Sequence, residues 1–593
     1  MYAQESEAAC GPWNPGIEST LPREYLPLST MFRPENVSTS VAEAHELADF
    51  TGLAPHDLVA FRPERLAVHE LLVRVMADLN VPDGRDYGDL GINFRDIAST
   101  ILSRHIVPQM ADIARAHAAT REQAARLIED ALAATIFAPA PPARRRGLFG
   151  GRRRSAMPAQ SVEEREMLTV ADWRRKAETA DDRLERSVYD ALVTVVTAIK
   201  GKRGRVLGDR ALLVSLATDL VGNSHGSEIV GETIAPLIRQ AISQEGYRVL
   251  PPQDRPVVMN VKGASASGKS TLRPLQRKLA EKIGVDWHDF ALISPDIWRK
   301  FLLDYNALGA AAKYAGTLTG HEVAVIDRKL DHYMAAKAKS GGMSHLLIDR
   351  FRFDSFATRE GEEEGGRLLT RFGDLVYMFF MITPPEATVE RAWKRGLEFG
   401  RYKAVDDLLD HNVEAYTGMP RLFFTWAAKT NKRVHCEFLD NSVPMGRPPR
   451  TIAFGWNGEL NILDIKCLLD VDRFRKIDIH ATGPEEVYRD SDSMAPERNT
   501  EFLRQCAETI PVINFLDWAS GRPYARCEGG KLTSLDPARL AAAMEDADAR
   551  AGFDAIAPQA GEDAIDADGL AEHLQRERAH TLGDWGEVAP ENA

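Results

Sequence analysis

Apolar residues recur at helical spacing through the first 250 residues of the chain. One stripe comprises Leu71, Leu72, Val75 and Leu79, and another comprises Trp173, Leu184, Val188, Leu192 and Val196. Spacings of three and four residues place such side chains on one face of a helix. The pattern predicts α-helical domains over residues 41–137 and 161–250, after an irregular arm over residues 1–40 that is rich in Pro, Ser and Glu.

Residues 138–160 interrupt the helical pattern. The stretch APAPPARRRGLFGGRRRSAMPAQ combines Pro and Gly with Arg144–Arg146 and Arg152–Arg154. Pro and Gly break regular structure and like charges repel, so an exposed linker is expected. The alternative is a site for phosphate or another anionic partner.

The pattern changes to alternating strands and helices from about residue 256. Short apolar runs, each followed by a helical segment, read PVVMNV, FALIS, SHLLID, LVYMFFMIT and RVHCEFLD. Buried runs separated by helices are typical of a mostly parallel sheet with helices on both faces, the α/β class. TIAFGW and ELNILDI flank Asn457-Gly458 and predict a hairpin. The domain is expected over residues 251–480, followed by a small helical, acidic C-terminal segment over 481–593.

Charge narrows the classes of function. The net charge is -13, but residues 540–593 carry thirteen acidic and three basic side chains, which leaves the rest of the chain close to neutral. A nearly neutral body gives no support to a nucleic-acid-binding surface. The five Cys are scattered, which predicts neither a disulfide framework nor a zinc site. The sequence shows no basic, apolar leader and no stretch long enough to span a bilayer, so we expect a soluble, cytoplasmic protein.

The strongest chemical signal follows the first predicted strand. Residues 263–271 match GxxxxGK[ST] between a strand and a helix, which is the context of a phosphate-binding P-loop. Backbone N–H groups of such a loop surround phosphate oxygens, Lys269 would bridge the β- and γ-phosphates of ATP, and Ser270 would supply a Mg²⁺ ligand. The nucleotide-binding residues are therefore expected to be Gly263, Ala264, Ser265, Ala266, Ser267, Gly268, Lys269, Ser270 and Thr271.

Two carboxylates end the next predicted strands. Asp296 follows FALIS and is expected at the carboxyl edge of the sheet, where it would accept the proton of an attacking hydroxyl. The alternative role is an N-cap for the following helix. Asp349 ends SHLLID, where it would ligate Mg²⁺ or orient substrate; alternatively it pairs with Arg350 or Arg352.

Cations cluster after the fourth predicted strand. Arg391, Lys394, Arg395 and Arg401 lie in ERAWKRGLEFGRY. In phosphoryl transfer such cations belong to a lid that closes over the phosphate and stabilises its developing charge. The alternative is a solvated amphipathic helix.

Together these motifs identify a family resemblance over about residues 257–464. GASASGKST, ISPDIWRKFLLDY, TLTGHEV, LLIDRF, ERAWKRGLEFGRY and EFLDNS resemble the zeta-toxin-like P-loop kinases. The resemblance implies an ATP- and Mg²⁺-dependent kinase acting on a small-molecule hydroxyl, typified by UDP-N-acetylglucosamine, often as a toxin with an antitoxin. It assigns Lys269 and Ser270 to the nucleotide loop, Asp296 as base, Arg391 and Arg401 to the lid, and His321 and Glu322 to acceptor contacts.

One position departs from the family pattern. Arg350-Phe351 stands where family members usually have Gly-Thr, and that turn lies near the acceptor, so the identity of the acceptor stays open. Nucleotides remain candidates beside nucleotide sugars.

Two alternatives concern the helical half of the chain. An ATP-hydrolysing regulatory or assembly module would act through residues 41–250 on a protein or nucleic-acid partner. In a subordinate hypothesis, residues 41–248 restrain the kinase in cis, as a helical antitoxin would. Against the first, Asp349 is followed by Arg350 and not by the carboxylate expected of a motor.

Overall fold

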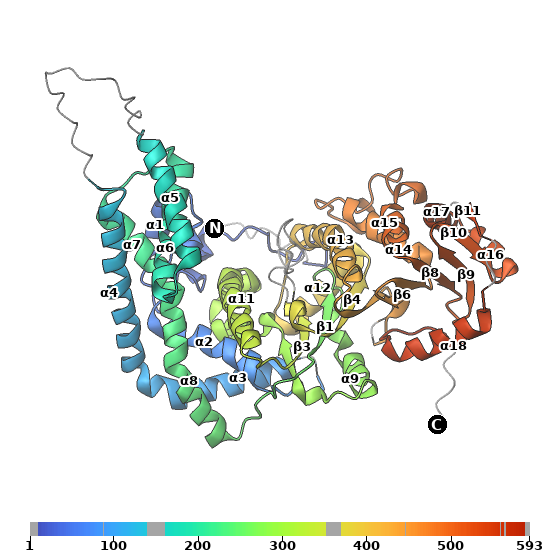
Figure 1. The fold of residues 1–593 in the computed structure, drawn as a ribbon, viewed down its shortest axis with the longest axis horizontal. Coiled ribbons are helices and arrows are strands. Elements are labelled where there is room, and N and C mark those ends of the chain that lie inside the picture. The colour runs from blue at the N-terminus through green and yellow to red at the C-terminus, as the bar shows by residue number, and fades with distance from the viewer. Residues whose placement is uncertain are drawn as a thin grey trace, which may run out of the picture.

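The computed structural model describes most of the chain: residues 10–86, 88–138, 161–350, 369–444, 446–557, 559–561 and 565–586. Figure 1 shows a helical bundle on the left, a sheet with flanking helices in the centre, and the continuation of that sheet with further helices on the right. Phe351, Arg352 and most of the predicted 138–160 linker lie outside the described residues.

Eight α-helices form the N-terminal bundle: α1 (Val41–Thr51), α2 (Pro63–Asp78), α3 (Asp89–Ile101), α4 (Met110–Ala134), α5 (Val162–Thr179), α6 (Arg183–Arg203), α7 (Arg210–Asn223) and α8 (His225–Glu245). Ser40 and Ser161 begin α1 and α5 with capping boxes, in which each hydroxyl accepts from the third helical N–H. Helix α4 packs on both α7 and α8, so the two predicted helical ranges share one apolar core.

Five parallel strands form the centre of the molecule. They are β1 (Val257–Lys262), β2 (Phe290–Ile293), β3 (His345–Asp349), β4 (Leu375–Ile382) and β5 (Arg433–Asp440), in the spatial order β5-β4-β1-β3-β2. Helices α9 (Arg273–Lys282), α10 (Arg299–Leu302), α11 (Ala315–Lys339), α12 (Pro385–Phe399) and α13 (Val405–Ala427) alternate with them. The expected α/β architecture is confirmed in this region.

The sheet continues beyond β5 through the predicted hairpin. Strands β6 (Arg450–Trp456) and β7 (Glu459–Ile462) pair antiparallel around Asn457 and Gly458, and Gly458 has the positive φ of 85° that this turn requires. Among the described residues the sheet then extends through β8 (Val512–Leu516), β9 (Pro523–Glu528), β10 (Lys531–Ser534) and β11 (Gln559–Ala560).

These last strands correct the expectation of a purely helical segment over residues 481–593. Helices are present as predicted: α15 (Glu501–Thr509), α16 (Pro537–Met544), α17 (Ala547–Ile556) and α18 (Ala567–Glu577), after α14 (Ile465–Arg473). The strands β8 to β10, however, bury their apolar residues on β7 and on α17. Partners distant in the sequence stabilise them, because their own patterns are short and partly polar.

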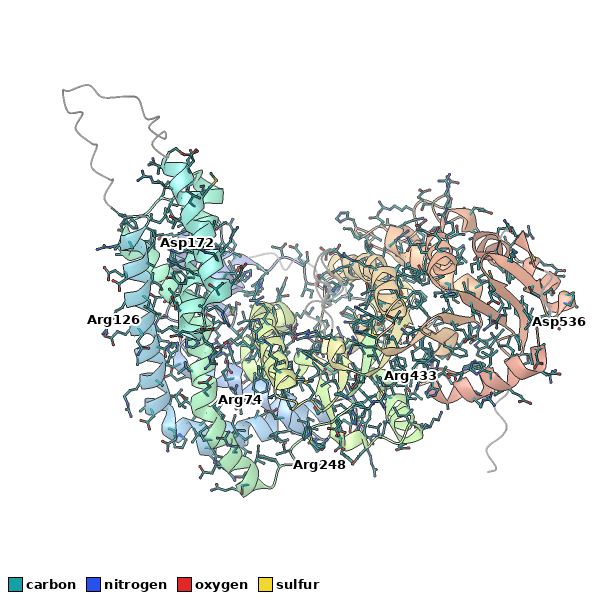
Figure 2. All side chains as sticks on the ribbon, in the orientation of Figure 1. Arg74, Arg126, Asp172, Arg248, Arg433 and Asp536 are labelled. Atoms are coloured by element: carbon teal, nitrogen blue, oxygen red, sulfur yellow. The ribbon has the colours of Figure 1, made fainter. Side chains whose placement is uncertain are left out.

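The helical bundle and the sheet are joined by a continuous apolar core. Helix α2 contacts both β2 and α11, and its buried residues belong to the same cluster as those of β1 to β3. Arg74, labelled in Figure 2 where α2 meets α8, is bound by Glu70 one turn earlier. In the described residues, no helix combines the length and apolar character needed to cross a membrane.

Candidate functional site

The glycine-rich loop leaves β1 at its carboxyl end and leads into α9. Gly268 has a φ of 98°, and a Cβ there would lie 2.3 Å from Asn441 Nδ2. A Cβ on Gly263 would lie 2.8 Å from both Met381 Cβ and Ser267 Oγ. Both positions therefore require glycine, the first for its conformation and the second for the close approach of β4.

The loop is fixed to two neighbouring strands through one carbonyl. Ser267 O accepts hydrogen bonds from Thr383 Oγ1 at 3.1 Å and Asn441 Nδ2 at 2.7 Å, just beyond the ends of β4 and β5. The Arg391 guanidinium donates to the same oxygen at 3.4 Å and to Asn441 O at 2.6 Å. Arg391 thus holds the loop against β5, which differs from the lid role that its sequence position predicts.

Lys269 lies at the centre of this loop. Its Nζ donates to the carbonyl oxygens of Gly263 at 3.1 Å and Ala264 at 2.7 Å. Burial lowers the pKa of Lys269 to about 8, Asp349 opposes this shift, and Arg395 adds to it. A buried ammonium group beside another cation is disposed to bind an anion.

Ser270 and Asp349 meet beside Lys269. Ser270 Oγ donates to Asp349 Oδ2 at 2.6 Å, so the hydroxyl that begins the helix and the carboxylate that ends β3 are adjacent, as predicted. Both are hard oxygen donors of the kind that Mg²⁺ prefers. No group of three or more His, Cys, Asp or Glu side chains within the described ranges is arranged to hold a metal.

Asp296 lies on the short 3-10 helix η7 (Pro295–Trp298), directly after β2. Its carboxylate accepts from Arg299 Nε at 2.9 Å and from Arg401 at 2.7 Å. Burial opposes ionisation, but Arg401, Arg299 and Arg395 hold the pKa of Asp296 well below its usual range. The side chain remains 50% exposed and so is accessible to a substrate.

The arginines around Asp296 refine the sequence prediction. Arg401 faces the site as expected. The charge of Arg395 lowers the pKa of both Asp296 and Lys269. Arg299 was not identified from the sequence, although its spacing of three residues from Asp296 within a helical segment was a usable signal. The charged residues that converge here are Lys269, Arg299, Arg395, Arg401, Asp296 and Asp349.

His321 and Glu322 lie on α11, and both contact residues of the N-terminal region. His321 stacks on His56 with ring centroids 3.9 Å apart. Glu322 is fully buried and accepts from Arg65 at 2.7 Å, and its other oxygen lies 2.6 Å from His69 Nε2. The structure therefore engages the Glu322 carboxylate inside the protein, and the acceptor contact that the resemblance implies stays a prediction.

The topology explains why distant residues converge. Each of the five parallel strands ends at or just before a part of the site: the loop, Asp296, Asp349, Thr383 and Asn441. Strands β3 and β4 are consecutive in the sequence, but they pair with β1 on its two opposite sides. Ligands of open α/β sheets bind at such a switch point.

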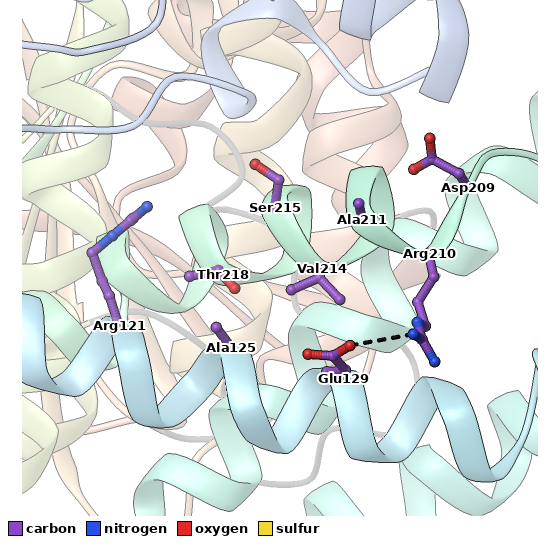
Figure 3. A pocket seen from close by; sticks show the side chains of 9 residues that line it. All are labelled: Arg121, Ala125, Glu129, Asp209, Arg210, Ala211, Val214, Ser215 and Thr218. Carbon is purple, nitrogen blue, oxygen red and sulfur yellow. Dashed lines mark ion pairs between the residues drawn. The ribbon is translucent and has the colours of Figure 1, made fainter.

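A separate cavity of about 640 Å³ lies between α4 and α7 (Figure 3). Its charged walls pair with one another or with neighbours: Arg210 with Glu129 at 3.4 Å, and Arg121 with Asp219 at 2.7 Å. The polar groups of this cavity are thus largely engaged within the bundle.

Comparisons with protein-family models, curated proteins and solved structures found no match to this chain. The resemblance to zeta-toxin-like kinases therefore stays a prediction from the motifs.

Proposed function

We propose that this chain is an ATP-dependent phosphotransferase that transfers the γ-phosphate of ATP to a hydroxyl of a small molecule, such as a nucleotide sugar or a nucleotide. The observation that carries the proposal is the meeting of three elements at one sheet edge. These are a glycine-rich loop with Lys269, a Ser270–Asp349 pair at 2.6 Å, and a half-exposed Asp296 bound by Arg401.

Lys269 binds the phosphates in this proposal. Its ammonium group leaves the carbonyl oxygens of Gly263 and Ala264 for the β- and γ-phosphate oxygens, which are stronger acceptors because they carry charge. Backbone N–H groups of the loop and the start of α9 contribute further positive potential. Thr383, Asn441 and Arg391 keep the loop in this shape by holding Ser267 O.

Mg²⁺, which would accompany ATP, supplies positive charge between the phosphates. Ser270 Oγ and Asp349 Oδ2 are the protein oxygens that would hold it, with phosphate oxygens and water completing its ligands.

Asp296 accepts the proton of the attacking hydroxyl. A carboxylate with a lowered pKa is a weak base, but phosphoryl transfer has a loose transition state in which the proton is lost late. Arg401 and Arg395 stabilise the charge that develops on the transferred group, since both lie beside Asp296. Positioning supplies most of the rate enhancement.

Asp296→Asn tests the proposal. The amide keeps the size of the side chain but neither accepts the proton nor balances Arg299 and Arg401. We expect ATP binding to persist and acceptor-dependent transfer to fall by about 10²–10⁴-fold. The assay incubates the protein with labelled ATP and a metabolite extract, and mass spectrometry identifies the labelled product. Transfer at the wild-type rate would contradict the assignment of the base.

A second candidate is an ATP-hydrolysing switch that acts through the helical bundle. One observation favours it: α3 packs on η7, and Gly91 approaches Ile297, the residue after Asp296. Movement at the site would reach the bundle directly through this contact. ATP consumption stimulated by a protein or nucleic-acid partner, and not by a small-molecule acceptor, would support the switch.

A further inference from the structure

The N-terminal arm, defined here as residues 10–30, crosses the candidate site. At its beginning Trp13 packs on an apolar cluster formed by α12, α13 and the segment after α14. Ala266 of the glycine-rich loop packs on the same cluster. The arm therefore reaches the wall of the site that carries the nucleotide loop.

The middle of the arm contacts the segment that carries Arg401. Ser19 Oγ donates to Asp406 Oδ2 at 2.6 Å. Lys313 Nζ donates to Pro15 O at 3.1 Å and lies 5.5 Å from the ring centroid of Tyr402. Tyr402 follows Arg401 directly, and Asp406 lies five residues after it in the first turn of α13, so residues 400–406, defined here as the lid segment, are held by the arm and by Lys313 together.

The end of the arm is anchored on the opposite wall. Lys313 belongs to the 3-10 helix η8 (Tyr305–Tyr314), which follows α10. Leu21, Tyr25 and Leu28 pack on the apolar cluster of η8 and α11, and Thr30 N donates to Leu318 O at 3.0 Å. Thr30 is fully buried, whereas Ser19 is exposed.

We propose that the arm is a strap that holds the lid segment against η8 and controls the entry and release of nucleotide. This inference rests on the proposed function, because a phosphotransferase lid must open in each cycle. The exposed Ser19–Asp406 bond is the part that releases, and the buried anchor at Leu318 keeps the arm attached. Opening thus separates Tyr402 from Lys313 of η8 without unfolding either wall.

The Ser19–Asp406 contact makes the strap sensitive to charge. A negative group at position 19 would face the Asp406 carboxylate, and like charges at that distance repel. Ser19→Asp therefore releases the strap at one point. Thr20→Asp adds the same charge at the neighbouring exposed residue and is the matched control. Trp13→Ala weakens the contact at the beginning of the arm, because it removes apolar packing on α12 and α13.

The test uses the full chain and two measurements. Hydrogen exchange of the amides in residues 400–407 reports the strap without any ligand. The association rate of a fluorescent ATP analogue with Mg²⁺ reports access to the site. We expect Ser19→Asp to speed lid exchange by about tenfold, as for the loss of one hydrogen bond to a charged group, and to speed association in parallel. Thr20→Asp should match the wild type in both measurements.

The outcomes separate the two proposals. Unchanged lid exchange in both Ser19→Asp and Trp13→Ala, or an equal increase in Thr20→Asp, overturns the strap. Faster exchange with an unchanged association rate overturns its control of nucleotide entry. If the analogue binds neither the wild type nor any variant, the proposed function fails, and nucleotide control fails with it.

Discussion

Lys269 hydrogen-bonds to the carbonyls of its own loop, so its charge is buried before any phosphate arrives. Lys269→Met removes the phosphate contact and also removes a charge whose burial is unfavourable. We expect ATP binding to be lost while the thermal midpoint stays unchanged or rises, because the lowered pKa of Lys269 shows that burial disfavours its charge. Titration calorimetry with ATP and thermal denaturation check the two parts. A large fall in the midpoint would show that the ammonium group stabilises the loop.

The pH dependence of ATP binding follows from the same residue. The pKa of Lys269 is about 8 in the free protein, and bound phosphates raise it because they favour the charged form. Well below pH 8 Lys269 is already protonated, so it adds no pH dependence to the affinity. Above pH 8 binding must take up a proton, so affinity falls by up to about tenfold per pH unit.

Calorimetry in buffers of different ionisation enthalpy measures this proton uptake. Lys262 titrates nearby, because its pKa is lowered to about 7. Lys269→Arg is therefore the control: it keeps the charge at position 269 and should abolish the fall of ATP affinity above pH 8. A slope that persists in Lys269→Arg would assign the proton to another group.

At the level of residues, the sequence predicted where the site residues lie more accurately than which groups they bind. The loop, Asp296 and Asp349 were placed correctly at the sheet edge, because a strand followed by a turn fixes where its last residue emerges. The burial of Glu322 against Arg65 and His69 joins residues more than 250 positions apart, and nothing local encodes it. Arg391 binds Ser267 O and Asn441 O, contacts that a cluster of cations on one helix does not reveal.

At the level of elements, Arg350 joins the end of β3 to α11. Its buried guanidinium donates to Asp327 at 2.8 Å and to Asp331 at 2.8 Å. The Arg350 side chain therefore faces α11. Arg350→Met leaves two buried carboxylates without this cation, and we expect it to cost about 3–5 kcal/mol of unfolding free energy.

Urea denaturation measures that cost. The exposed pair Arg504–Glu501 provides the control, since Arg504→Met should change stability by less than about 1 kcal/mol. Similar small losses in the two variants would mean that the Asp327 and Asp331 carboxylates are neutralised by other groups.

The C-terminal segment after α18 is attached to β5 through one carboxyl group. Glu437 accepts from Leu582 N at 2.8 Å, Gly583 N at 3.0 Å and Thr451 Oγ1 at 2.7 Å. Burial raises the pKa of Glu437 to about 7, and these three donors oppose the shift.

This pKa predicts how stability changes with pH. The folded protein retains the Glu437 proton between about pH 4.5 and 7, whereas the unfolded chain loses it. The group therefore stabilises the fold below pH 4.5, and this contribution decreases as the pH rises to 7, by roughly 3 kcal/mol in all. The difference in unfolding free energy between wild type and Glu437→Gln, measured across this range, should show that slope. A constant difference would contradict it.

The elements missed by the sequence have a common cause. The strands β1 to β5 were predicted because each contains a short apolar run between helical segments, and the hairpin because Asn457-Gly458 specifies its turn. Strands such as PYARCE and KLTS are short and polar, and they become strands through pairing with β8 and with each other. Strands of this kind depend on tertiary context more than on propensity.

For the whole molecule, the helical bundle and the sheet form one structural unit. Buried residues of α2, α3 and α8 share an apolar cluster with β1 to β3 and α11. A buried polar network runs through the same interface: Lys329 of α11 donates to Ser227 at 2.6 Å, and Ser227 donates to Glu70 at 2.6 Å. The sequence suggested separable helical domains because periodicity shows which face of a helix is buried, but not against what.

This shared core decides how a truncation should behave. A fragment of residues 251–593 would expose the apolar faces of β2 and α11 and leave Glu322 without Arg65 and His69. An unpaired buried carboxylate and an uncovered apolar face each cost several kcal/mol, which is a large part of the stability of a typical protein. We therefore expect the fragment to aggregate or to unfold without cooperativity, and co-expression with residues 1–250 to restore a soluble complex. A soluble fragment with a sharp thermal transition would instead make the bundle a detachable domain, and only then would removal of residues 41–248 be a fair test of restraint in cis.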